Sequence, residues 1–435
     1  MNLAHMVSRI MGIVGVRFAG AGIGFLTQLI LARIMPASEV GIVFMGMSAA
    51  AFISLAASGG YSMLALTQLP KLALFRGRAL LRAFHHLVLL DSLVMTLLCG
   101  AVVFVADRLV GLTEGQAIAL LFGWLCTPSA GSIRYYSAIA TSNRRFNAAF
   151  IPDFVIRPGM LLAFVLISFL VGHKPSIIEV LIVFTVASWS MAAVLAYQLR
   201  DVGVSLHGLS FPRGKFARLL RSRALALTLV AATLLAIADI VTLLAGFLLP
   251  AADVAVVGIT MRLAALVAYV IQASQQFVMP DFTQAIVKGD GATADTLAAR
   301  MNVMTLLLIG AALLGAIILG EWVLGMFGSE YVRGANILVL FLVAQAVRAL
   351  SGMNQHLLSI KGYQMRTAGA CLTALLVLVF SAILFTRLFG MEGMAYALLL
   401  AELAWLVLLA AQAQSLCGRR ADLFWMLQKR LAKVQ

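Results

Sequence analysis

The sequence predicts an all-α polytopic membrane protein with about twelve transmembrane helices in two pseudo-symmetric halves. Three observations predict it: the apolar composition, the number of apolar segments long enough to cross a bilayer, and a short sequence motif that recurs about half the chain length later. Hydrophobic residues make up 63% of the 435 residues and charged residues 11%, with a mean hydropathy of +1.03. Soluble domains have roughly 45–50% apolar and about 25% charged residues, so the composition excludes an ordinary soluble protein.

The apolar segments are long enough to act as membrane spans. A span needs roughly 20 mostly apolar residues to cross a hydrocarbon core about 30 Å thick. Each must be helical, because lipid offers no partner to an unpaired backbone group. The expected spans lie near residues 12–35, 40–66, 83–106, 115–140, 153–172, 177–199, 225–249, 254–279, 300–320, 334–358, 367–388 and 392–416.

The loops between these spans differ in basic charge. With the N-terminus in the cytoplasm, about 22 Lys and Arg residues fall on the inner side and about four on the outer side, as the positive-inside rule requires. The outer four are Arg108, Lys174, Arg333 and Arg387. The asymmetry predicts both termini in the cytoplasm, and it accounts for the net charge of +15 without a nucleic-acid partner.

Two turn phrases recur at one offset. PASEV at residues 36–40 returns as PAADV at 250–254, and residues 107–111 match 321–325. Both turn phrases link two spans on the outer side, so the halves have the same orientation and are related by an axis along the membrane normal. In each phrase the proline suits a helix start, and the acid three residues later meets the positive end of the helix dipole.

The repeat and the basic stretches predict four regions. The first six helices occupy residues 1–199 and the last six occupy 224–416. Between them, the basic stretch 200–223 is either an amphipathic helix on the anionic inner leaflet or a solvated linker. The basic tail 417–435 is predicted to be an interfacial helix as well.

Several stretches resemble Wzx-type polysaccharide flippases. The matching stretches are residues 31–60, which contain the first turn phrase, then 142–167 and 236–267. The resemblance implies the multidrug/oligosaccharidyl-lipid/polysaccharide exporter superfamily, whose two lobes surround a central cavity that opens alternately inward and outward. It implies transport of an undecaprenyl-pyrophosphate-linked oligosaccharide across the bacterial inner membrane for O-antigen, capsule or exopolysaccharide assembly. Membrane lipids, a polysaccharide polymerase and glycosyltransferases are the other implied partners.

Charged residues inside the spans are the main functional signal. A charge at the bilayer centre costs at least about 2.5–3.5 kcal/mol, so it must face a cavity, pair with an acid or snorkel. The acids in spans are Asp91, Asp239 and Glu402, with Asp153 at a span end. The arginines outnumber them: Arg17, Arg33, Arg134, Arg157, Arg262 and Arg348. An arginine excess suits an anionic cargo, since a guanidinium can bind pyrophosphate oxygens bidentately.

Helical spacing groups these arginines with neutral polar residues. Arg17 shares a helix face with Gln28, Arg262 with Tyr269 and Gln276, and Arg348 with Gln355. In the related lipid II flippases a cavity arginine lies where Arg262 stands here, so the resemblance points to the same residue. The predicted pyrophosphate and sugar site therefore consists of Arg17, Arg262, Arg348, Arg157, Gln28, Tyr269, Gln276 and Gln355.

Each of these residues also has a purely structural interpretation. Arg157 is as well placed to pair with Asp153 at i and i+4. The glutamines and Tyr269 could equally serve as interhelical hydrogen-bonding groups. Asp239 and Glu402 either neutralise an arginine or bind a coupling proton or Na⁺.

Other functional classes have less support. The chain has no P-loop, its histidines and cysteines lack metal-ligand spacing, and no catalytic constellation is visible, so we expect neither an enzyme nor a cofactor. Three alternatives to the Wzx-type function remain: a multidrug or cation antiporter of the same superfamily, a lipid II flippase, and a non-transporting scaffold for polysaccharide synthesis. A cation antiporter predicts acids in the first helix, and residues 12–35 contain none.

Overall fold

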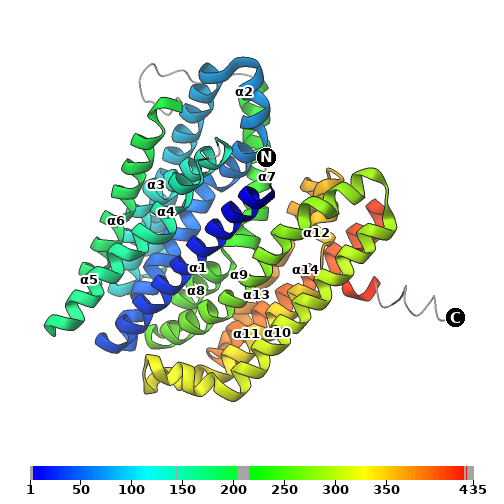
Figure 1. Ribbon diagram of the computed structural model, residues 1–435. Helices are drawn as coiled ribbons and strands as arrows, with labels where there is room; N and C mark the ends of the chain where they lie inside the picture. Colours follow the sequence, from blue (N-terminus) through cyan, green and yellow to red (C-terminus); the bar gives the residue numbers. More distant parts are fainter. Residues whose placement is uncertain (1–2, 144, 203–214, 426–427, 429–435) are drawn as a thin grey trace. The chain divides into compact units, whose positions relative to one another are not determined.

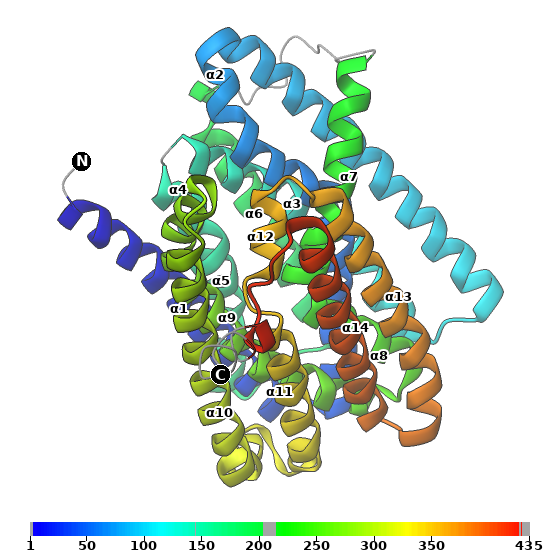
Figure 2. The ribbon, with the colours of Figure 1, turned by 90° about the vertical axis from the view of Figure 1, so that its right-hand side faces the viewer.

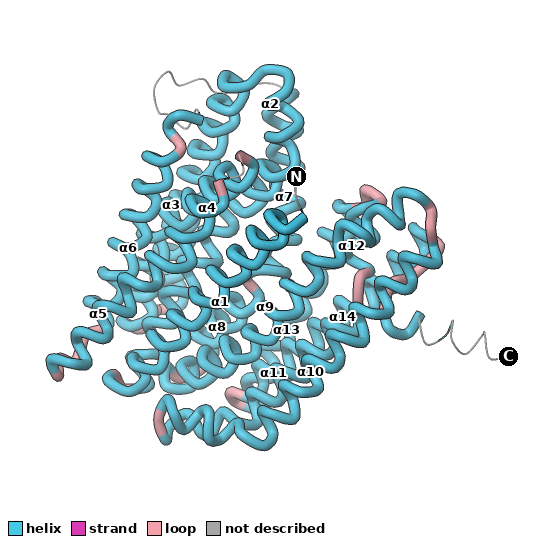
Figure 3. Tube along the Cα trace, in the orientation of Figure 1, coloured by secondary structure: helices cyan, strands magenta, loops and turns pink. Residues whose placement is uncertain are grey.

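The computed structural model describes residues 3–143, 145–202, 215–425 and 428, and the regular structure in this part is entirely helical (Figures 1 and 3). The helices are α1 (Leu3–Ile34), α2 (Ala37–Val110), α3 (Glu114–Ser142), α4 (Phe146–Ile151), the π-helix η1 (Pro152–Ile156), α5 (Arg157–Val171), α6 (Ile177–Gln198), η2 (Arg200–Val202), α7 (Lys215–Leu235), α8 (Ile237–Leu248), α9 (Ala251–Lys288), α10 (Gly291–Phe327), η3 (Ser329–Gly334), α11 (Ala335–Leu350), α12 (Asn354–Ile360), α13 (Gln364–Phe389) and α14 (Glu392–Cys417).

The helices account for the predicted spans. Within the described residues, ten helices are long and apolar enough to cross a membrane, by length and composition. Two shorter apolar helices, Phe18–Ile34 and Ile237–Leu248, fall within the first and seventh predicted spans. The prediction of an all-α polytopic membrane protein is confirmed.

Contacts divide the chain into two compact units, residues 1–255 (unit 1) and 256–435 (unit 2). The predicted halves, in contrast, end at residue 199 and begin again at 224. The difference arises because α7 and α8, which the repeat assigns to the second half, pack along α2 and so group with unit 1. The division into six plus six helices stays a prediction.

Helix ends follow local sequence signals. α3 begins with a capping box of Thr113 and Gln116, and α6 with one of Ser176 and Glu179; each satisfies backbone N–H groups that a helix start leaves free. α2 and α9 each begin one residue after the proline of a turn phrase, with Glu39 and Asp253 in their first turns.

α2 runs without interruption through two predicted spans and the basic segment between them. The hydroxyl of Tyr61 donates to the carboxylate of Asp91, although about 45 Å would separate these residues in a straight helix at 1.5 Å rise per residue. The helix must therefore bend back on itself, and Figure 2 shows α2 rising and turning down again. The predicted loop at residues 67–82 is instead helical.

In unit 1, α2 packs closely against α7, α8 and the start of α9, and glycines permit the approach. A Cβ on Gly41 would lie 1.8 Å from the carbonyl oxygen of Ala251, and one on Gly60 would lie 1.8 Å from that of Ala224. Gly41 directly follows the first turn phrase, and Ala251 belongs to the second. The residue that follows the first repeated motif thus packs against the second.

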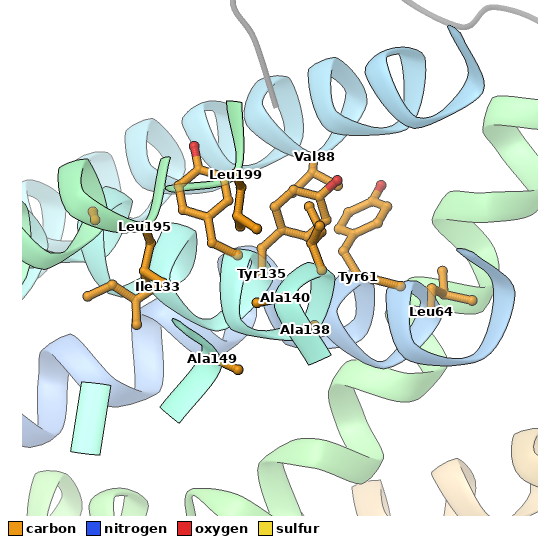
Figure 4. Close-up of a cluster of buried hydrophobic side chains, with 14 of the residues drawn as sticks. Tyr61, Leu64, Val88, Ile133, Tyr135, Ala138, Ala140, Ala149, Leu195 and Leu199 are labelled. Carbon is orange, nitrogen blue, oxygen red and sulfur yellow. The ribbon is translucent and has the colours of Figure 1, made fainter. Parts of the chain in front are cut away.

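A buried cluster fills the space between α2, α3, α6 and α7. It includes Tyr61, Tyr135, Leu195 and Leu220, and Figure 4 shows the first three side chains gathered with their neighbours. The ring of His85 stacks on Tyr135 with centroids 5.7 Å apart.

Unit 2 is built around α14, which packs against α11, α12 and α13, while α10 packs against α11. One of its core clusters joins Phe282 of α9, Ala298 of α10, Met353 just before α12, Leu357 within α12, and Ala421 beyond α14.

Two predicted spans are interrupted. The seventh breaks at Ala236 between α7 and α8, and the tenth breaks at residues 351–353 between α11 and α12, where Gly352 has φ +55°. A non-glycine residue rarely adopts that backbone conformation, so the tenth span cannot run as one helix through Gly352. The expectation of a continuous span at 334–358 is therefore wrong.

The two predicted surface helices are only partly described. Residues 203–214 lie outside the described part, and 215–223 form the start of α7. In the tail, α14 ends at Cys417 and the segment to Trp425 is described, whereas residues 426–427 and 429–435 lie outside the described part.

The glycine run at residues 20–24 offers a matched test of helix packing. A Cβ on Gly20 would lie 2.3 Å from the carbonyl oxygen of Phe154 in η1, whereas one on Gly22 would meet nothing within 4 Å. We expect Gly20→Ala to lower stability by about 1–3 kcal/mol through overpacking. Gly22→Ala should be neutral or stabilising by up to about 1 kcal/mol. Thermal unfolding in detergent measures both, and equal effects would contradict the packing of α1 on η1.

Candidate functional site

Arg157 forms an ion pair at the π-helix in unit 1. Its Nη2 lies 2.9 Å from Oδ1 of Asp153, and the guanidinium carbon lies 5.9 Å from the ring centroid of Phe184. Asp153 belongs to η1 and Arg157 directly follows it, so the widened turn carries both charges. π-turns inside α-helices are frequent at functional sites. The structural alternative for Arg157, pairing with Asp153, is present.

Arg348 forms a second ion pair, in unit 2. Its Nε donates to both carboxylate oxygens of Glu402, at 2.9 and 3.0 Å. Glu402 is 2% exposed on the inner face of α14. One turn further along, the ring centroid of Trp405 lies 6.0 Å from the guanidinium carbon of Arg348. A buried carboxylate needs such compensation, because an isolated charge in a low-dielectric interior is strongly unfavourable. Glu402 is thus paired with Arg348, and whether it also binds a coupling proton or Na⁺ stays a prediction.

Asp239 lies in the first turn of α8, directly after the break at Ala236. Its Oδ1 accepts a hydrogen bond of 3.2 Å from the hydroxyl of Ser48 on α2. Asp239 is half-buried, and it stands where the seventh span is interrupted.

Arg262 lies within α9 and is half-buried. Its Nη1 donates to the carbonyl oxygen of Gly258, one turn earlier, at 3.4 Å. One side of α9 beyond it is more open, since Tyr269 is 57% exposed.

The remaining predicted site residues are less informative. Gln28 and Gln355 are half-buried, and the side chains of Arg17 and Gln276 lie outside the described part. The structure thus joins Arg157 to Asp153 and Arg348 to Glu402. Cargo contact by Arg17, Arg157, Arg262, Arg348 and their polar neighbours stays a prediction.

One charged cluster near the start of α7 escapes prediction from the sequence. The sequence places Arg221 in a basic loop and Asp91 in a span, yet Arg221 donates to Asp91 from Nε and Nη2 at 2.6–3.1 Å. Hydrogen bonding to Asp91 raises the pKa of the Arg221 guanidinium above its ordinary value. The signal that could have revealed the cluster is the single acid of the third span, which has no nearby basic partner in the sequence.

The second cluster that escapes prediction involves the tail. Asp422 is fully buried and accepts a hydrogen bond of 2.8 Å from Nδ2 of Asn354. Asp422 is the one acid among the basic residues of 417–435, and this could have drawn attention to it.

The fold is similar to that of two kinds of membrane transporter whose structures have been solved. An inward-facing multidrug resistance MATE family transporter of the MOP superfamily superposes with a TM-score of 0.73 at 14% identity, over 92% of this chain and 97% of that one. The lipid II flippase MurJ in an inward closed conformation superposes with a TM-score of 0.72 at 14% identity, over 93% of this chain and 87% of that one.

An outward-facing MATE transporter superposes with a TM-score of 0.61 at 14% identity, over 93% of this chain and 94% of that one. No model of a protein family matches the sequence, and no curated protein matches it. At these identities the comparisons show the two-lobe, all-helical fold, which both drug transporters and a lipid flippase share.

The buried ion pair in unit 2 can be tested directly. We expect Glu402→Gln to lower stability by about 3–5 kcal/mol, because it leaves the Arg348 guanidinium without its carboxylate. Removing both charges, as in Arg348→Met with Glu402→Leu, should recover most of that loss. Thermal unfolding in detergent checks this, with the exposed Glu321→Gln as the matched control. A Glu402→Gln protein as stable as wild type would show that the pair does not form.

Proposed function

We propose that the protein is a Wzx-type flippase for lipid-linked oligosaccharides. It moves an undecaprenyl-pyrophosphate-linked oligosaccharide from the cytoplasmic to the outer leaflet of the bacterial inner membrane, with both termini in the cytoplasm. The product serves surface polysaccharide assembly. The observation that carries the proposal is a MurJ-like fold over nearly the whole chain, combined with spans in which arginines outnumber acids.

The chemistry of the cargo matches these side chains. Pyrophosphate offers several anionic oxygens, and arginine keeps its charge when partly desolvated, so Arg17, Arg262 and Arg348 are the groups we assign to the headgroup. Gln28, Tyr269, Gln276 and Gln355 would receive sugar hydroxyls. The lipid tail stays in the bilayer while the two lobes alternate between inward and outward openings.

The ion pairs suggest how an ion gradient could be coupled to this movement. Arg157 and Arg348 already hold carboxylates, so a pyrophosphate must displace Asp153 or Glu402 to bind them. Protonation of Glu402 would remove that competition and release Arg348 for cargo. Asp239, beside the break in the seventh span, is a second candidate for a coupling H⁺ or Na⁺.

A multidrug or cation antiporter is the second candidate function. Its support is the similarity to the MATE transporter, equal in quality to that with MurJ. Cationic substrates need acids along their route, and α1 contains none, which favours the flippase.

Transport can be measured in proteoliposomes with undecaprenyl-pyrophosphate-linked N-acetylglucosamine that carries a fluorophore on the sugar. A membrane-impermeant quencher then reports the rate at which the label crosses. We expect Arg262→Ala to reduce this rate at least about tenfold, the equivalent of about 1.4 kcal/mol of lost cargo interaction. Arg387→Ala is the control, because Arg387 is exposed in the last turn of α13.

Three results would redirect the proposal. Wild-type vesicles no faster than protein-free ones would exclude flipping of this headgroup. Ethidium efflux that depends on Asp239 would favour the antiporter. Neither activity, with a normal level of folded protein, would favour a scaffold.

A further inference from the structure

The chain beyond α14 turns back into unit 2. Gly418, with φ +65°, ends α14, and the next residues run over the side of unit 2 formed by α10 and α12 (Figure 2). Ala421 is 2% exposed and Asp422 is not exposed at all. We call residues Gly418–Asp422, which pack against Met353 and Asn354, the tail clasp.

The tail clasp binds the break in the tenth span through backbone groups. The N–H of Met353 donates to the carbonyl oxygen of Ala421 at 3.1 Å, and the N–H of Ala421 donates to Oδ1 of Asn354 at 2.7 Å. Asn354 in turn donates from Nδ2 to Asp422. A Cβ on Gly352 would lie 2.5 Å from the Ala421 oxygen, so the tail passes directly against the break.

Charged and polar groups hold the tail clasp in place. Asp422 also accepts hydrogen bonds from Nε of Arg420 at 2.6 Å and from the N–H of Trp425 at 2.9 Å. Nearby, Nη2 of Arg419 contacts Asp295 of α10 at 2.6 Å. Both oxygens of the Asp422 carboxylate therefore accept hydrogen bonds, which a carboxylate needs in order to be buried.

The break that the tail clasp binds is also the end of the helix that carries Arg348. The carbonyl oxygen of Arg348 accepts hydrogen bonds from the N–H and the hydroxyl of Ser351, at 3.1 and 2.7 Å. The tenth span is therefore contacted at two places. Glu402 of α14 pairs with Arg348, and the segment that follows α14 binds Met353 and Asn354. Release of the tail would leave the Met353 N–H without its acceptor and free the last turn of α11 to shift.

We propose that Asn354 and Asp422 are positioning residues, which hold the broken tenth span in the shape that presents Arg348 to the pyrophosphate of the cargo. The cargo part of this inference rests on the proposed function. The structural part, that the tail clasp sets the Arg348–Glu402 geometry, stands independently.

An exchange of the two side chains tests the tail clasp. In Asp422→Asn the one amide oxygen is needed by the Trp425 N–H, so the NH₂ group faces Nδ2 of Asn354, donor against donor. In Asn354→Asp two carboxylates face each other. Each single variant therefore breaks the pair. In the double variant the carboxylate at position 354 accepts from the Ala421 N–H and from the amide at position 422, whose oxygen still accepts from the Trp425 N–H. Asp290→Asn is the control, an exposed helix-capping acid at the start of α10.

The opening of the tail clasp is read by trypsin cleavage after Arg419 and Arg420 in the purified full-length protein, with the fragments identified by mass. We expect fast cleavage in both single variants and slow cleavage in the double variant, the control and wild type. Unchanged protection in the single variants would overturn the tail clasp.

Positioning is read by the binding of undecaprenyl pyrophosphate to the same proteins in detergent. The single variants should raise its Kd at least about fivefold, and the double variant should return it to within about twofold of wild type. Single variants that are cleaved quickly but bind normally would reduce the tail clasp to a structural role. If wild type itself does not bind this lipid, the proposed function fails and the cargo role of these residues fails with it.

A thermal double-mutant cycle tests the structural part whatever the cargo. If the tail clasp sets the Arg348–Glu402 geometry, the melting-temperature losses of Asp422→Asn and Glu402→Gln should overlap, so that the combined variant loses clearly less than their sum. Strictly additive losses would show that the tail clasp and the ion pair are independent, and would overturn the inference.

Discussion

Backbone hydrogen bonding in lipid is the constraint on which this structure depends. An N–H or C=O group in the hydrocarbon core must find its partner inside the protein, which explains why the described spans are helical and why an interruption needs support. At residues 152–156 a π-turn preserves the backbone hydrogen bonding, because the N–H of Arg157 donates to the carbonyl oxygen of Pro152. At residues 351–353 the regular helical hydrogen bonding stops, and Ala421, beyond α14, accepts the hydrogen bond from the N–H of Met353.

Ionisable residues gather at these irregular points. Asp153 and Arg157 lie at the π-turn, Asp239 directly follows the break at Ala236, and Arg348 directly precedes the break at 351–353. A regular helix presents its side chains at fixed angles, whereas an interrupted one can turn a charge toward a partner and can change shape at low cost. Broken helices near the membrane midplane form ion and substrate sites in secondary transporters for the same reason.

The predictability of each feature depends on the range of the interactions behind it. Each apolar span carries its own signal in about 20 residues, and the Asp153–Arg157 pair is four residues apart, so both could be read locally. The continuity of α2 through residues 67–82 could not be predicted from the sequence, because a basic helix outside the bilayer has the same composition as a basic loop. Asn354 and Asp422 are far apart in the chain, and no spacing rule connects them.

The pairing of Arg348 with Glu402 also shapes what such a site can do. A ligand moves a conformational equilibrium only by its difference in affinity for the two states. An arginine that is free in every state would hold pyrophosphate equally well on both sides of the membrane, so its contact would favour neither state. An arginine that exchanges a carboxylate for the cargo binds well only when that carboxylate is protonated or displaced. Under the proposed function, the buried acid would make the affinity for the cargo depend on the state of Glu402.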